Sequence, residues 1–139
     1  MKLQKNTLFA LYSVLESASH PERQLSAAEI ARKYGISPHH LAKVLHTLAR
    51  AGVVESVRGV GGGYRFAGNA KRLTLMDVIA LFESIGAPAR GSRRRQAAGI
   101  AVERALESVL AEIDEIAKAT LRSISIATLL KLMERQRRR

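Results

Sequence analysis

The chain has 139 residues, of which 47% are hydrophobic, and this is enough for one compact domain with a real core. Its formal net charge of +11 favours a polyanionic partner, and nucleic acid is the first candidate. Cysteine is absent, which excludes disulfides, thiol switches and zinc or iron–sulfur centres held by thiolates of this chain.

The first predicted helix ends before His20 and Pro21. Its apolar stripe follows helical spacing and should pack on the core; the stripe consists of Leu8, Leu11, Tyr12 and Leu15. Polar and basic residues precede this helix and can donate to DNA phosphates from its N-terminal end: Lys2, Gln4, Lys5 and Asn6. A frayed chain end is the alternative interpretation.

A second helix is predicted from the capping box that Ser26 forms with Glu29, and it carries Ile30 and Tyr34 inward. Gly35 suits the left-handed conformation that closes this helix. Ser37 can cap the next helix and Pro38 suits its first turn, so the pattern is helix, short turn, helix. The third helix ends at Gly52, and its apolar stripe is Leu41, Val44, Leu45 and Leu48.

The start of this third helix is typical of a recognition helix, whose first residues meet base edges in the major groove. The candidate base-reading residues are Ser37, His39, His40 and Lys43. A three-helix scaffold with an ordinary solvated face is the alternative.

Two β-prone runs, residues 53–57 and 64–66, flank a glycine-rich connection and predict a hairpin, the wing of a winged helix. Arg58 at its mouth is placed to enter a narrow minor groove. The glycines can bring backbone amides close to phosphate, or they can mean a flexible tip. The wing adds these candidate DNA-binding residues: Arg58, Gly61, Gly62 and Tyr64.

A second capping box, Thr74 to Asp77, starts a helix with the stripe Val78, Ile79, Leu81 and Phe82. Residues 85–99 then read as a loop. The arginines at 93–95 within it are a solvated run, a contact to the DNA backbone, or a cradle for an anionic effector.

The next amphipathic segment has a narrow apolar strip with alternating spacings of four and three, which favours a dimer seam over a core helix. The strip consists of Val102, Leu106, Val109, Ile113, Ile116 and Thr120. A last helix runs through residues 126–133, and the arginines at 137–139 are interpreted as a disordered tail. The expected division is a winged helix-turn-helix domain (1–84), a loop (85–99), and the dimerisation and C-terminal helices (100–139).

Other classes of protein find little support in the sequence. No nucleophile–base set, phosphate loop or dinucleotide fingerprint is found, so an enzyme is not expected. The histidines, His20, His39, His40 and His46, lack the spacing of a metal site, and no cofactor is expected. No apolar run reaches the roughly 18 residues that span a bilayer and no secretory signal is found, so no membrane contact and a cytoplasmic location are expected.

The motifs taken together resemble those of the Rrf-type winged helix-turn-helix regulators, the family of the IscR, NsrR and CymR proteins. The resemblance covers nearly the whole chain and rests mainly on residues 35–38 (Gly-Ile-Ser-Pro), 51–54 (Ala-Gly-Val-Val), 56–59 (Ser-Val-Arg-Gly), 61–65 (Gly-Gly-Gly-Tyr-Arg) and 73–78 (Leu-Thr-Leu-Met-Asp-Val). It implies a bacterial homodimer with crossed C-terminal helices, and it adds Pro38 and Gly59 to the expected DNA contacts.

The chain departs from the cluster-binding relatives at residues 87–95, where those relatives hold cysteines and this chain reads Ala-Pro-Ala-Arg-Gly-Ser-Arg-Arg-Arg. We therefore expect a regulator without an iron–sulfur cluster. Its control is left open among a small-molecule effector, a partner protein and abundance alone.

The prediction for function is a sequence-specific, double-stranded-DNA-binding repressor that acts as a homodimer on a pseudo-palindromic site. A nucleoid-type protein that coats DNA without sequence preference is the alternative, because charge alone would suffice for it. A third interpretation makes the apolar strip a docking surface for a different protein.

Overall fold

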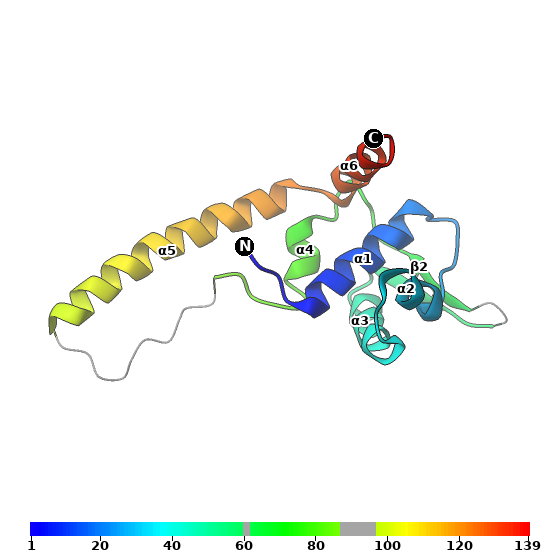
Figure 1. Cartoon of the computed structure of the whole chain (residues 1–139), viewed down its shortest axis with the longest axis horizontal. Coiled ribbons are helices and arrows are strands. Elements are labelled where there is room, and N and C mark those ends of the chain that lie inside the picture. Colours follow the sequence, from blue (N-terminus) through cyan, green and yellow to red (C-terminus); the bar gives the residue numbers. More distant parts are fainter. Residues whose placement is uncertain (60–61, 87–96) are drawn as a thin grey trace.

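The structure, a computed structural model, describes residues 1–59, 62–86 and 97–139. Figure 1 shows a rounded head from which one long helix, α5, projects. The elements in chain order are α1 (Lys5–Ser19), α2 (Ala27–Tyr34), α3 (Pro38–Arg50), β1 (Val54–Val57), β2 (Gly63–Phe66), α4 (Leu75–Ile79), α5 (Ala97–Ser123) and α6 (Ile126–Arg137). The expected class, mainly helical with a small β-hairpin wing and a long C-terminal helix, is confirmed.

Helix α1 lies at the centre of the head and contacts α2, α3, α4, α6 and β2 (Figure 1). The predicted stripe is partly wrong: Leu11 is buried, Leu8 and Leu15 are half-buried, and Tyr12 is 36% exposed. The buried face instead combines Val14 with small or hydroxyl-bearing residues: Thr7, Ala10, Ser13, Ser17 and Ala18. A helix packed on several sides needs small side chains for close approach, and hydrophobicity alone does not mark them.

The helix-turn-helix follows the sequence closely. Ser26 accepts from the backbone N–H of Glu29 and caps α2, and Gly35 closes it at φ 64°. Pro38 occupies the first turn of α3 as expected, but Ser37 makes no side-chain capping bond, so that detail was wrong. All four predicted core residues of α3 are buried, and Gly52 takes a φ of 78° just beyond its end.

The hairpin forms with Val54 paired to Phe66 and Val57 to Gly63, each strand beginning one residue away from the expected place. A third chain segment, not predicted, joins it: Leu25 and Tyr64 exchange two backbone hydrogen bonds of 2.8 Å. A Cβ at position 63 would lie 2.5 Å from the Leu25 carbonyl oxygen. Gly63 is therefore required for this close approach of two backbones.

Helices α4 and α6 close the other side of the head. The capping box of Thr74 with Asp77 is present in both directions, but α4 ends at Ile79, so Leu81 lies beyond it and is 37% exposed. Ser125 caps α6 and bridges Thr74, and Ile126 is fully buried in the core. The arginine tail was partly mispredicted, because α6 extends through Arg137.

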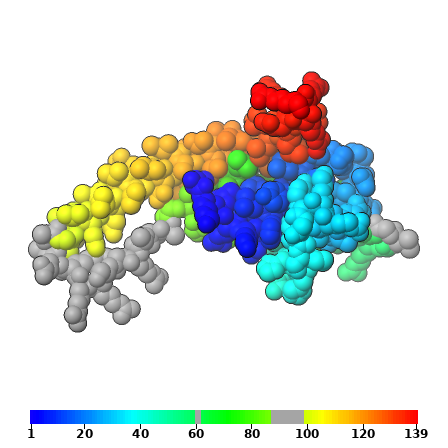
Figure 2. Space-filling model, viewed as in Figure 1, coloured from blue at the N-terminus to red at the C-terminus, as the bar shows by residue number. Residues whose placement is uncertain are grey.

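Helix α5 begins at Ala97, inside the segment expected to be a loop, and continues for 27 residues. The head end of α5 contacts α4 (Figure 1), while the opposite end extends away from the head (Figure 2). The predicted arginine run at 93–95 lies outside the described residues. The division into domains at 84 and 99 stays a prediction.

Candidate nucleic-acid interface

The outward face of α3 is polar and open. The side chains on its core side are buried, and this fixes which side chains face away from the head; the buried ones are Leu41, Val44, Leu45 and Leu48. The residues of this helix that were predicted to contact DNA are all exposed: Ser37, Pro38, His39, His40 and Lys43. The structure thus places these residues together on the first turns of one helix, the part that enters the major groove in helix-turn-helix proteins.

The wing follows this helix in the chain, and its first strand, β1, packs on α3. Arg58 and Gly59 are exposed at the end of β1, and Gly59 has a φ of 113°. A turn bond of 2.8 Å runs from the Gly62 amide to the Gly59 carbonyl, and a Cβ on Gly62 would lie 2.7 Å from the Val57 carbonyl oxygen. The predicted residue Gly61 lies outside the described residues.

Tyr64, also predicted to contact DNA, is half-buried and packs against the core. An ion pair between Arg65 and Glu55, 2.9 Å apart, crosses the two strands of the wing. Arg58 directly follows β1, whose last residue, Val57, is paired with Gly63 of β2.

A polar cluster that sequence reasoning missed ties α2 to α1. The carboxylate of Glu16, on α1, accepts hydrogen bonds of 2.6 Å from both Lys33 and Tyr34, on α2. Burial alone would raise the pKa of Glu16, but the bonds from Lys33 and Tyr34 and the charge of Lys33 lower it below its usual value. Burial and the bond to Glu16 raise the pKa of Tyr34, whose ring stacks on Tyr12 at 5.0 Å.

The N-terminal segment is held by a residue far away in sequence. Lys2 and Gln4, both predicted to contact phosphate, are exposed. The backbone N–H of Gln4 donates to the carboxylate of Glu83, at 2.8 Å, and the hydroxyl of Thr7 donates to the same oxygen. No local sequence pattern predicts this contact, because 76 or more residues separate the partners.

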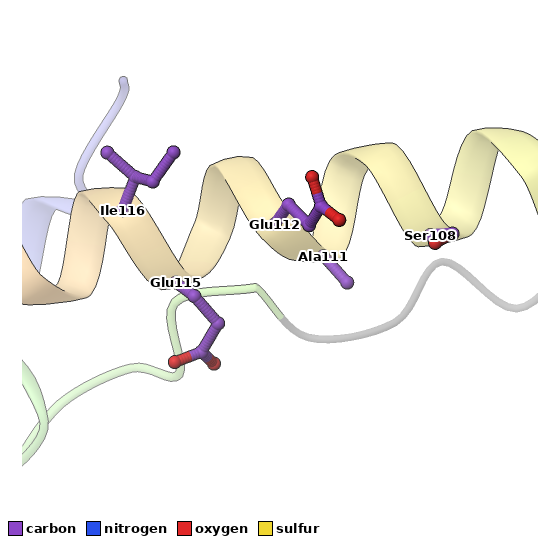
Figure 3. Close-up of a pocket in the computed structure, with 5 residues that line it drawn as sticks. All are labelled: Ser108, Ala111, Glu112, Glu115 and Ile116. Carbon is purple, nitrogen blue, oxygen red and sulfur yellow. The ribbon is translucent and has the colours of Figure 1, made fainter.

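The apolar strip on α5 faces outward. Five of the predicted residues, Val102, Leu106, Val109, Ile113 and Ile116, are between 54% and 66% exposed, and the sixth, Thr120, is also exposed. Leu110, 54% exposed, belongs to the same surface and was missed. A shallow groove of about 510 Å³ lies along the flank of the helix, lined by Ser108, Ala111, Glu112, Glu115 and Ile116 (Figure 3).

Neither a metal centre nor a membrane span is found in the part of the chain that the structure describes. There, no three or more His, Asp or Glu side chains gather into a group that could hold a metal ion. No helix among residues 1–59, 62–86 and 97–139 combines the length and apolar character needed to cross a bilayer.

These features define a winged helix-turn-helix protein. The sequence matches the family described as Rrf2, iron-dependent transcriptional regulator, over residues 3–132. The chain belongs to this family, and it is therefore a transcription regulator with a DNA-binding winged helix.

Individual relatives agree with this assignment. The chain is 57% identical to the HTH-type transcriptional regulator BadM of Rhodopseudomonas palustris, over all of this chain and 87% of that protein. Among solved structures it is similar to IscR of T. potens, at 26% identity and a TM-score of 0.78, over 98% of this chain and 90% of that one. CymR, the global cysteine regulator of B. subtilis, gives 25% identity and a TM-score of 0.77, over 95% and 98%.

The family's description names iron, but this chain has no thiolate that could bind it. The whole chain lacks cysteine, and the described His, Asp and Glu side chains form no alternative ligand group. The residues present therefore do not fit a cysteine-ligated iron–sulfur cluster.

Proposed function

We propose that the chain is a sequence-specific repressor that acts in the cytoplasm as a homodimer on a pseudo-palindromic DNA site. In each subunit α3 enters the major groove and Arg58 of the wing enters the adjacent minor groove. A dimer bound in this way covers its stretch of duplex and excludes other proteins from it, which is the physical basis of repression.

The observation that carries the proposal is the apolar face of α5. Six large aliphatic side chains on this helix are more than half exposed. Isolated hydrophobic residues are normal on a surface, but a contiguous row of them marks an interface. A second copy offers the same row, so a two-fold axis brings like surfaces together.

The geometry of pairing gives the second step. A two-fold axis through paired α5 helices relates the two heads, so two α3 helices face the duplex in opposite directions. Such dimers read half-sites whose centres lie about one helical turn, roughly 34–36 Å, apart or a multiple of it. The expected operator is an inverted repeat.

Control without a cysteine-ligated cluster is part of the proposal, since no thiolate is available in the chain. A small-molecule effector, a partner protein and abundance alone remain the three modes of control. The purified protein should be colourless; visible absorbance from sulfide-to-iron charge transfer would contradict this part of the proposal.

Selection from a random duplex library at physiological salt tests the DNA-binding function. The expected result is an enriched inverted repeat, bound at least about a thousandfold more tightly than random duplex at the same salt. The net charge of +11 favours one other candidate, a protein that coats DNA without sequence preference. Equal, salt-sensitive binding to every duplex would support that candidate and reject the repressor.

A further inference from the structure

The start of α1 is fastened by a remote carboxylate in place of a local one. In an ordinary capping box the third residue of the helix supplies the carboxylate that accepts from the N-cap amide. Here the third residue is Thr7, and Glu83 accepts from the N-cap amide of Gln4, at 2.8 Å, and from the Thr7 hydroxyl. Thr7 is fully buried in the head, and Glu83 is half-buried.

The contacts of Glu83 leave other groups at the start of α1 available to contact phosphate. It uses the Gln4 amide and the Thr7 side chain, while Lys5 and Asn6, the first two helical residues, are exposed. Lys2 is exposed just before them. The amides of a first helical turn and nearby ammonium groups are common phosphate ligands, but they act only if the helix start holds its place.

The segment that carries Glu83 lies close to α5 at its far end. Gly86 has a φ of 77°, and a Cβ there would lie 2.7–2.8 Å from atoms of the Asp114 side chain on α5. Residues 83–86 therefore touch both the start of α1 and the helix proposed to pair the subunits. The same segment, with Met1, Lys2 and Leu3, borders a pocket of about 440 Å³ against α5.

We propose that Glu83 is a positioning residue for DNA binding: it holds the start of α1, so that Lys2 and Lys5 reach the phosphate backbone of the operator. This inference rests on the proposed function. Glu83 itself does not contact DNA in this proposal. It acts through its hydrogen bonds from Gln4 and Thr7 at the start of α1. Removal of Glu83 should weaken binding to every duplex alike and leave the preferred sequence unchanged.

The test measures the salt dependence of binding for wild type, Glu83→Ala and Thr7→Val on the duplex that wild type selects. Each phosphate contact contributes about 0.9 to the slope of log affinity against log salt. Loss of the Lys2 and Lys5 contacts in both variants should lower the slope by about 1.8 per subunit, or about 3.6 for a dimer, while the selected motif stays the same. Glu22→Gln, in the exposed turn after α1, removes a carboxylate elsewhere and should keep the wild-type slope.

The same substitution in a chain that lacks both lysines distinguishes a positioning role of Glu83 from a general loss of structure. In a chain that already carries Lys2→Gln and Lys5→Gln, Glu83→Ala should lower the slope no further, because the contacts it supports are gone. Circular dichroism tests whether each variant is folded. If Glu83→Ala unfolds, Thr7→Val tests the same prediction.

Two results would overturn the inference: a wild-type slope in both Glu83→Ala and Thr7→Val, or an equal loss in both backgrounds. Absence of any preferred duplex for wild type would instead reject the proposed function, and this result is obtained before any variant is made.

Discussion

The head and helix α5 bury their apolar residues in opposite ways. In the head, Leu41, Leu45 and Leu48 of α3 are completely buried against the chain's own helices. On α5, side chains of the same kind, such as Leu106 and Leu110, are more than half exposed. The comparison shows that the head has a core within one chain, whereas the apolar face of α5 is not covered by its own chain.

The largest effect is expected from a cavity in the head. Leu45→Ala removes a fully buried side chain on the inner face of α3, and such changes cost about 2–5 kcal/mol of unfolding free energy. Denaturant unfolding measures this loss. The matched change Leu106→Ala on α5 should cost much less in a diluted, monomeric sample; an equal loss would erase the contrast between the two regions.

A charge on the apolar face of α5 should separate the subunits. Leu106→Glu places two unpaired carboxylates in the proposed seam, and we expect the dimer to weaken by about 3 kcal/mol, or more than a hundredfold. Dilution of labelled protein gives the dissociation constant. Ala111→Glu, at an exposed position on the side of α5 opposite Val102, is the control; an intact dimer in Leu106→Glu would mean that another surface pairs the chains.

The Glu16 cluster makes part of the head's stability depend on pH. Because the pKa of Glu16 is lower in the folded state than in the unfolded state, its contribution is complete above the unfolded value, near 4.5, and is lost as pH falls through the folded value. Glu16→Gln should cost about 1.5–3 kcal/mol at neutral pH, the range for hydrogen bonds to charged groups. Its unfolding free energy should then change less with acid than that of wild type, and an unaltered acid dependence would show that other carboxylates dominate.

The smallest effect on stability is expected from a substitution at the wing, where the side chain is proposed to contact DNA. Arg58→Ala should leave the unfolding free energy within about 0.5 kcal/mol of wild type, because the side chain is exposed. It should cost about 1–3 kcal/mol of binding to the selected duplex if the arginine reads a groove. Titration of labelled duplex measures this, and unchanged affinity would remove Arg58 from the interface.

How well the sequence predicted each part follows from how local its determinants are. The Ser26 cap, Gly35 and Pro38 each act within a few residues, and their positions marked the helix-turn-helix correctly. The capping box of Thr74 with Asp77 likewise marked the start of α4. The inner face of α3 also followed from spacing alone. For α1 the same rule misplaced the buried face, because contact with several elements favours small residues such as Ala10 and Ser17.

The contacts that were missed join distant parts of the chain. Leu25 meets Tyr64, Glu16 meets Lys33 and Tyr34, and Glu83 meets Gln4 and Thr7. No local sequence pattern predicts such partners, because the two residues of each contact lie far apart in the sequence. The roles of the DNA-facing residues and of the α5 strip stay predictions, because they depend on molecules outside a single chain.

The mass of the protein in solution tests the central claim most directly, namely that α5 is completed by a second copy of the chain. Sedimentation equilibrium of the free protein at micromolar concentration should give twice the 15.2 kDa of one chain. On a duplex carrying the selected inverted repeat, the complex should weigh two chains more than the duplex alone. A free species of 15.2 kDa at that concentration, and a complex with one chain per duplex, would contradict the claim.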